Sequence, residues 1–200
     1  MANGVRICDF VERADTSALS DLAQRAPWDL TYSADAIVRA LFAALGPDYS
    51  QFDGVAVHNT ARIEQGAALK APVIIGPNCF IASTALLRGG CWLERNVIIG
   101  PACELKSSFI FEGSKLAHLN FVGDSILGAD VNIEAGAMLA NYRNERDDKR
   151  IRIGAIDTGV DKFGALVGDG SRVGANAVIA PGALIPPRSI VPRLALIDQG

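Results

Sequence analysis

The chain has 200 residues, 50% of them hydrophobic, with 19 basic and 22 acidic side chains and a net charge of −3. This length suits one domain, and the hydrophobic content excludes wholesale disorder. The acidic balance argues against a nucleic-acid partner, which favours a broad basic surface. The sequence contains no apolar run of membrane-spanning length and no signal-peptide core near its start. It therefore predicts a cytoplasmic protein without membrane contact.

The first part of the chain, residues 1–52, predicts a small helical segment. Hydrophobic spacing favours helices over 17–24 and 33–45, with Ser33 as a candidate N-cap and Gly46 after the second helix. A solenoid needs its open end covered. We therefore expect this helical N-terminal cap segment to cover the first coil of the repeat that follows.

Residues 53–200 carry a six-residue repeat, in which a large apolar residue follows a mostly small one by two positions. The large members of the first series are Val57, Ile63, Leu69, Ile75, Ile81, Leu87, Leu93, Ile99, Leu105 and Phe111. The beat slips by one residue at Ile110 and again at Leu127, and it resumes from 167 to 191. This pattern predicts a mainly β fold, a parallel β-helix wound around a triangular prism. Coils of 18 residues give about six or seven turns.

Between 140 and 164 the repeat is interrupted by a strongly polar stretch. Such a stretch cannot form a wall of the prism, so it predicts a long protruding loop. Long loops in compact repeat proteins are usually functional.

Three cysteines, Cys79, Cys91 and Cys103, stand 12 residues apart at the small inward position of the repeat. That spacing differs from the spacing of zinc ligands, and two histidines are too few for a three-histidine zinc site. We interpret the cysteines as small buried hydrophobic residues and predict no metal.

A column of cations is the first candidate for chemistry. Lys70, Arg88 and Lys106 are 18 residues apart, one per coil, and each follows an inward aliphatic residue. They should therefore lie about 5 Å apart on one edge of the prism, where their charges repel. Two interpretations remain open: a phosphate group bridges the column, or the column is a solvated basic edge.

The second candidate is His118, which follows the inward Leu116 by two residues and should face outward. An imidazole beside an anion site suits a general base, and the alternative is an ordinary surface histidine. Asn132, Asn141 and Tyr142 flank the polar interruption. These asparagines could contact a ligand or could serve turn geometry.

Several motifs resemble one known family. They are Glu104-Leu105-Lys106, Gly113-Ser114-Lys115-Leu116-Ala117-His118-Leu119, Gly123-Asp124, Val131-Asn132-Ile133 and Ala140-Asn141-Tyr142. They are similar to the acetyltransferase domain of bifunctional N-acetylglucosamine-1-phosphate uridyltransferase/glucosamine-1-phosphate acetyltransferases. The stretch from 157 to 170 is closer to the archaeal sugar-phosphate nucleotidyltransferases that carry the same kind of domain. The likeness covers about 50–192.

The resemblance implies a left-handed β-helix, a homotrimer, and acetyl-CoA bound in a cleft between subunits. It makes His118 the catalytic base, Arg88 and Lys106 phosphate ligands, and Asn132, Asn141 and Tyr142 sugar contacts. It places Ala135, Ala175 and Asn176 beside the acetyl-CoA. Where the family has a tyrosine this chain has Phe121, a substrate-site residue without the hydroxyl. Lys149 and Arg150 are candidates to replace a loop lysine of the family.

The leading hypothesis is an acetyl-CoA-dependent N-acetyltransferase, an acyltransferase acting on an amino-sugar 1-phosphate. The alternative is a non-catalytic sugar-phosphate-binding or assembly module that partners a separate nucleotidyltransferase. A third hypothesis is an acyltransferase whose acceptor is not a sugar.

Overall fold

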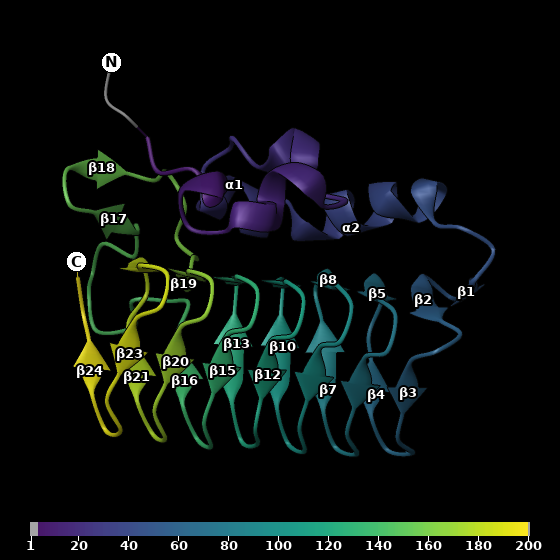
Figure 1. Ribbon diagram of the computed structural model, residues 1–200. Coiled ribbons are helices and arrows are strands. Elements are labelled where there is room, and N and C mark those ends of the chain that lie inside the picture. The colour runs from purple at the N-terminus through teal and green to yellow at the C-terminus, as the bar shows by residue number, and fades with distance from the viewer. Residues whose placement is uncertain (1–3, 200) are drawn as a thin grey trace.

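The computed structural model describes residues 4–199, and its main body is a parallel β-helix with three walls (Figure 1). Each six-residue repeat supplies one short strand, and every third strand of the helix joins the same sheet. In the described residues each wall contains seven parallel strands, which makes seven coils. The predicted fold class is confirmed.

We call the three walls sheets A, B and C, in the order in which each coil visits them. Sheet A contains β1 (Tyr49–Phe52), β2 (Val55–His58), β5 (Val73–Ile75), β8 (Cys91–Leu93), β11 (Phe109–Ile110), β14 (Ile126–Leu127), β19 (Ala165–Val167) and β22 (Ala183–Ile185). Sheet B contains β3 (Arg62–Ile63), β6 (Phe80–Ile81), β9 (Ile98–Ile99), β12 (Lys115–Leu116), β15 (Asn132–Ile133), β20 (Arg172–Val173) and β23 (Ile190–Val191). Sheet C contains β4 (Ala68–Leu69), β7 (Leu86–Arg88), β10 (Glu104–Lys106), β13 (Phe121–Gly123), β16 (Met138–Leu139), β21 (Val178–Ile179) and β24 (Leu196–Ile197). Strand β1 is antiparallel to β2 and extends sheet A at the first coil.

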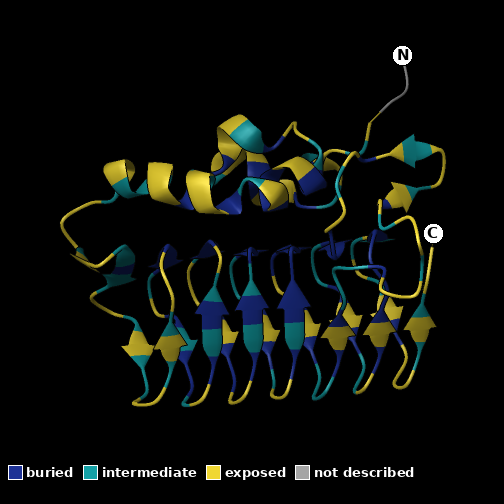
Figure 2. Cartoon of the chain, turned by 180° about the vertical axis from the view of Figure 1, so that it is seen from behind, coloured by how far each residue is buried: buried dark blue, intermediate teal, exposed yellow. Residues whose placement is uncertain are grey.

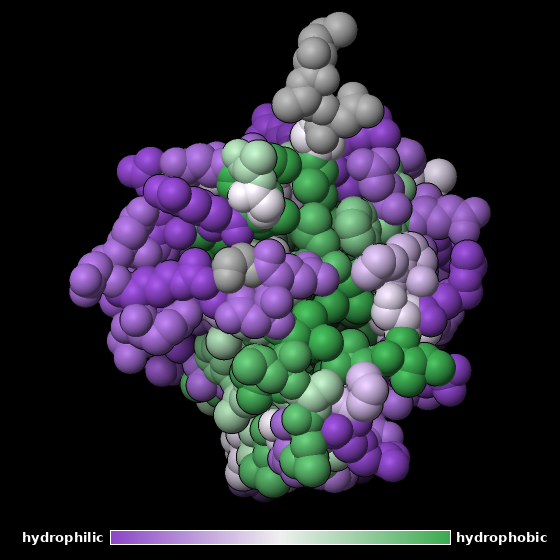
Figure 3. Space-filling view, turned by 90° about the vertical axis from the view of Figure 1, so that its left-hand side faces the viewer, coloured by the Kyte–Doolittle hydropathy of each residue, from purple (hydrophilic) through white to green (hydrophobic). Residues whose placement is uncertain are grey.

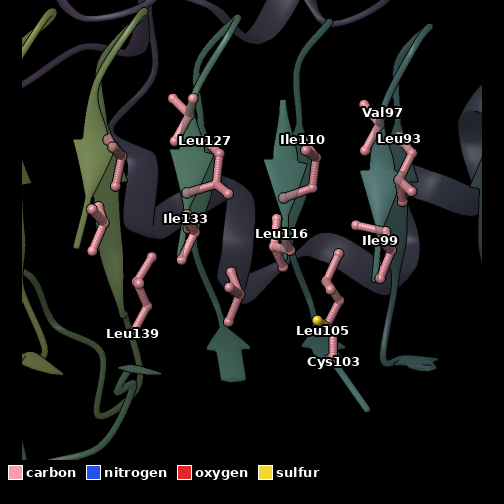
Figure 4. Close-up of a cluster of buried hydrophobic side chains, with 14 of the residues drawn as sticks. Leu93, Val97, Ile99, Cys103, Leu105, Ile110, Leu116, Leu127, Ile133 and Leu139 are labelled. Carbon is pink, nitrogen blue, oxygen red and sulfur yellow. The ribbon is translucent and has the colours of Figure 1, made fainter. Parts of the chain in front are cut away.

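The prism is filled by the aliphatic residues that the repeat predicts to point inward (Figure 4). Leu93, Ile99 and Leu105 belong to three different walls, and all three are fully buried. Their strands stack on those of the next coil in register, Ile99 against Leu116 for example. The core is therefore a continuous column of side chains, and no single coil could bury its own apolar residues.

One member of the predicted series points the other way. The inward residue of the fourth coil in sheet A is Ile110, whereas Phe111 and Phe109 point out of the prism. Phe111 packs edge-on against Trp92, with 5.4 Å between ring centroids. The slip therefore falls before Ile110, because the chain spends five residues instead of six on that corner.

The N-terminal segment is helical, but it does not lie across the end of the first coil. Its elements are η1 (Ile7–Asp9), η2 (Glu12–Thr16), η3 (Ser20–Leu22), α1 (Pro27–Tyr32), α2 (Ala34–Leu41) and η4 (Phe42–Ala44). They lie along the outer surface of sheet A, with buried sides toward the sheet and exposed sides toward solvent (Figures 1 and 2). A second hydrophobic core forms there, and it includes Ile74, Trp92 and Leu166 from three different coils. The placement differs from the expectation because sheet A is apolar on both faces and needs cover along its whole length.

The polar interruption leaves the prism, as predicted, but part of it is packed. Its outer part forms a small hairpin, β17 (Arg152–Ile153) and β18 (Ile156–Asp157). Ile151 and Phe163 are buried in the second core, and Phe163 lies edge-on to Trp28 of α1 with centroids 6.0 Å apart. The interruption and the N-terminal segment therefore stabilise each other above sheet A.

The C-terminal end of the prism has an apolar surface (Figure 3). Its last coil exposes Ile190, Leu194 and Leu196. Gln199 covers part of the edge of sheet A, since its side-chain amide donates to the carbonyl of Leu184 and its oxygen accepts from the Leu184 N–H. Among the described residues there is no helix with the length and apolar character that crossing a bilayer requires.

Candidate functional site

The predicted cation column lies on the outer surface of sheet C, near the corner where the chain passes to sheet A. Arg88 and Lys106 are register partners on the neighbouring strands β7 and β10. Lys70 directly follows β4, and its backbone N–H donates to Leu87 of the same wall. The structure therefore brings the three cations together on one wall, because inward Leu69, Leu87 and Leu105 turn the next side chain outward.

Two of these cations are paired with carboxylates. The Arg88 guanidinium lies 2.6 Å from Glu104 Oε1. Lys106 Nζ donates to both oxygens of Asp124, at 2.9 and 2.7 Å. Opposite charges thus relieve the repulsion expected within the column. Donors remain for an anion, since a guanidinium has five N–H groups and an ammonium has three.

Asp124 connects the cation column to the start of the interruption. Its side chain is 6% exposed and also accepts a hydrogen bond from Asn141 Nδ2. A Cβ at Gly123 would lie 2.7 Å from the Phe121 ring and 2.8 Å from the Asn141 amide. Gly123 therefore leaves room for both groups to lie over the strand. We call Phe121, Asn141, Asp124 and Lys106 the sheet C cluster.

His118 lies at the corner between sheets B and C, and its imidazole is exposed as predicted. Among residues 4–199 the imidazole has no hydrogen bond or ion pair, so its nitrogens face solvent. Gly123, the register partner of Lys106, follows His118 by five positions. Even for a fully extended chain, the distance between the Cα atoms of His118 and Gly123 is at most roughly 16 Å. Phe121 lies between them on the same wall.

The predicted acetyl-CoA residues stack on the corner that carries His118. Gly136 N–H donates to the carbonyl of His118, and Asn176 N–H donates to that of Ala135, both at 3.0 Å. Ala175, beside Asn176, belongs to the same corner of the next coil. Asn176 has a φ of 55°, so turn geometry accounts for an asparagine there.

Glu134 holds this corner in place. Its carboxylate accepts the Ala175 N–H at 2.8 Å and the Arg193 guanidinium at 2.7 Å. The hydrogen bond from Arg193, followed by that from Ala175, lowers the pKa of the Glu134 carboxyl below its ordinary value. Three successive coils are thus joined where the acetyl-CoA residues are predicted.

The structure separates Asn132 from the other predicted substrate residues. Asn132 lies on the outer surface of sheet B, between its register partners Lys115 and Arg172. Asn141 follows β16, at the end of this strand of sheet C, and bonds Asp124 there. Within one chain the two asparagines therefore belong to different walls.

Tyr142 and the candidate replacements for the loop lysine begin the interruption. Lys149 Nζ lies 5.5 Å from the centre of the Tyr142 ring and donates to the carbonyls of Asn144 and Arg146. Arg150 instead pairs with Asp157 at 3.0 Å. Neither cation contacts the sheet C cluster in this structure.

Cys79, Cys91 and Cys103 are all buried in the prism, as predicted. Burial raises the pKa of the Cys79 and Cys91 thiols to about 11. Residues 4–199 contain no group of three His, Cys, Asp or Glu side chains that could hold a metal ion.

The two carboxylates that pair with the cations were not predicted from the repeat. A signal for Asp124 exists: it follows Lys106 by 18 residues, one coil, so its proximity could have been inferred. Glu104 lies two residues before Lys106 and faces the same side of the strand as Arg88.

Comparisons with known proteins agree with the resemblance over part of the chain. No family model matches. A bifunctional sugar-1-phosphate nucleotidylyltransferase/acetyltransferase from Sulfurisphaera tokodaii is 41% identical over 69 residues, 34% of this chain and 17% of that protein. The bifunctional protein GlmU of Methanococcus vannielii is 38% identical over 66 residues, 32% of this chain and 16% of that protein. The alignment thus spans less than a fifth of these relatives.

A solved structure shows the same fold. It is a hexapeptide transferase family protein from Anaplasma phagocytophilum, with a TM-score of 0.51 and 15% sequence identity. The superposition covers 72% of this chain and 74% of that one. The likeness therefore concerns the β-solenoid itself.

Proposed function

We propose that the protein is an acetyltransferase that uses acetyl-CoA to acetylate the amine of an amino-sugar phosphate. The observation that carries the proposal is the exposed His118 imidazole, without a partner in residues 4–199, at the corner that leads into the wall bearing Arg88 and Lys106. The names of the curated relatives, which include acetyltransferases, support it. We further propose the amino-sugar 1-phosphate as acceptor, by resemblance.

In the proposed reaction His118 acts as the general base. The amine nitrogen attacks the thioester carbonyl, an N–C bond forms, and the C–S bond breaks. His118 accepts the amine proton and returns it to the leaving thiolate. Proton transfer by a positioned imidazole contributes about 10²–10⁴-fold to such reactions.

Arg88 and Lys106 would hold the phosphate with the N–H donors that Glu104 and Asp124 leave free. A phosphate held there would orient the amine of the same sugar toward the imidazole, which reduces the entropic part of the activation barrier. Phe121 offers an apolar surface for the sugar ring, between the cations and His118. A tyrosine there would add a hydroxyl that this chain lacks.

We also propose a homotrimer. Within a single chain, Asn132 and the cation column lie on different walls. If a second copy placed its sheet B against sheet C of the first, Asn132 of the second copy would lie near His118 of the first. The predicted acetyl-CoA corner lies between the same two walls.

The substitution His118→Ala tests the function, and His58→Ala is its matched control. His58 lies on the first coil, bonded to Thr60 and edge-on to Tyr49. With acetyl-CoA and glucosamine 1-phosphate, we expect His118→Ala to lower the rate of product formation at least 10²-fold. His58→Ala should leave it within threefold. Mass spectrometry of the acetylated sugar phosphate measures both. An unchanged rate in His118→Ala would contradict the proposal.

A second candidate is a non-catalytic sugar-phosphate-binding or assembly module that partners a separate nucleotidyltransferase. The pairing of both cations with carboxylates and the absence of a Phe121 hydroxyl favour it. A thermal-shift experiment separates the two. Stabilisation by acetyl-CoA supports the enzyme, whereas stabilisation by sugar phosphate alone supports the module.

A further inference from the structure

Two neighbouring clefts lie between the N-terminal helices and residues 159–162, the last part of the interruption before the chain re-enters the prism. The first is bounded by Tyr32, Asp35, Lys106 and Lys162 and has a volume of about 330 Å³. The second lies beside Lys149 and Arg150 and has the same volume. Tyr32 and Asp161 line both clefts, so the two meet there. We call the combined groove the Tyr32 cleft.

The aromatic side chain at this junction is unusually accessible. Tyr32 is 71% exposed, whereas Trp28, Leu30 and Thr31 of the same helix are buried. Packing against sheet A therefore does not explain the aromatic residue at position 32. An exposed ring beside a cleft can stack with the flat face of another ring.

Two unpaired charges of opposite sign stand next to each other in the cleft wall. Among residues 4–199, neither Asp161 nor Lys162 has a hydrogen-bond or ion-pair partner for its side chain, and both are exposed. An ammonium binds a phosphate as a point charge, and a carboxylate accepts hydrogen bonds from neighbouring hydroxyls. Asp161 and Lys162 thus suit a ligand that carries both a phosphate and hydroxyl groups.

The floor of the first cleft reaches the sheet C cluster. Lys106 and Asp124 line it. Two of the three N–H groups of Lys106 can be assigned to Asp124, so one donor remains for a ligand in the cleft. At the other end, the ion pair between the Arg150 guanidinium and Asp157 is exposed, so it contributes little to stability and can exchange for a phosphate.

We propose that the Tyr32 cleft binds the nucleoside diphosphate part of a nucleotide-linked sugar. Tyr32 stacks with the base, Asp161 accepts the ribose hydroxyls, and Lys162 and Lys106 contact the phosphates. Because Lys106 is shared with the proposed acceptor site, this inference rests on the proposed function and narrows its substrate class: the amino-sugar 1-phosphate is then one part of a nucleotide-linked amino sugar. One cleft of about 330 Å³ lies at the lower end of ligand-site volumes, whereas the two clefts together offer room for a ligand of this size.

Calorimetric titration tests the ligand class. The full chain is titrated with UDP-glucose, GDP-mannose, dTDP-glucose, glucose 1-phosphate and the neutral sugar chitotriose. We expect at least one nucleotide sugar to bind tenfold or more tightly than glucose 1-phosphate. If none does, or if chitotriose binds most tightly, the inference is overturned.

Substitutions test the residues. Tyr32→Ala and Lys162→Ala should each weaken binding of the nucleotide sugar at least fivefold and leave glucose 1-phosphate unchanged. Phe52→Ala and Arg25→Ala remove an equally exposed ring and an exposed cation elsewhere, and should change neither affinity. Equal losses for both ligands, or no loss, would overturn the inference. Both target side chains are exposed, and circular dichroism confirms that the variants fold.

The experiments distinguish a failure of this inference from a failure of the proposed acetyltransferase function. Acetylation of glucosamine 1-phosphate without any nucleotide-sugar binding would overturn this inference alone. Nucleotide-sugar binding that depends on Tyr32, without acetyl transfer to any amine, would overturn the proposed function alone.

Discussion

Asp124 shows how one residue changes the meaning of a predicted site. Without carboxylate partners, the column of Lys70, Arg88 and Lys106 would be an anion site. Glu104 and Asp124 neutralise two of these cations, Arg88 and Lys106. A carboxylate that is 6% exposed would be costly to leave unpaired. Lys106 therefore has a structural role in addition to any contact with phosphate.

The inward cysteines allow a residue-scale prediction about reactivity. Cys91 is fully buried, and desolvation raises its pKa to about 11, so at pH 8 it is almost entirely the unreactive thiol. We expect iodoacetamide at pH 8 to modify Cys8, which is partly exposed, and to spare Cys79, Cys91 and Cys103. Mass spectrometry before and after urea unfolding measures this. Modification of Cys91 in the native protein at the rate of Cys8 would contradict it.

At the scale of the strand and corner, several glycines are explained by the neighbouring coil. Gly76 and Gly100 follow inward aliphatic residues, where the sequence suggests a tight turn, yet neither has a positive φ. A Cβ at Gly100 would lie 1.6 Å from the carbonyl oxygen of Ala117, and one at Gly76 would lie 2.5 Å from that of Glu94. The requirement is therefore close approach between coils stacked at strand spacing.

The substitution Gly100→Ala tests this explanation. A methyl group there must displace the backbone of the next coil, so we expect the free energy of unfolding to fall by about 3 kcal/mol or more, at the upper end of overpacking costs. Gly46→Ala is the control, because nothing lies within 4 Å of its Cβ position. It should stay within about 1 kcal/mol of the unmodified protein. Urea unfolding followed by circular dichroism gives both values, and equal effects would contradict the explanation.

At the scale of the whole molecule, two segments far apart in sequence complete one structure. The outer surface of sheet A is covered by the N-terminal helices and by Ile151 and Phe163 of the interruption. Asp169 fixes this cover to the prism, since its carboxylate accepts the N–H groups of Glu12 and Ala129. The same arrangement forms the Tyr32 cleft above the sheet C cluster.

Trp28→Ala measures how much the cover contributes to stability. Trp28 is 7% exposed and contacts Phe163, so its truncation leaves a cavity between the two segments. We expect a loss of about 3–5 kcal/mol in the free energy of unfolding. Phe52→Ala, at a position 78% exposed, should change it by about 0.5 kcal/mol or less. A loss below 1 kcal/mol for Trp28→Ala would show that the cover is not cooperative with the prism.

The sequence predicts the β-helix, the inward residues and the outward direction of Arg88, Lys106 and His118. It could do so because a six-residue period fixes which side chain faces the core of a prism. The three-dimensional structure was needed to show where the helical segment lies, that Asn132 and Asn141 belong to different walls, and that Asp124 and Glu104 pair with the cations. The repeat gives the position of a residue within a coil, so it can bring Asp124 near Lys106, but it does not specify which side chains form ion pairs. It also says nothing of contacts between a wall and a segment outside the prism.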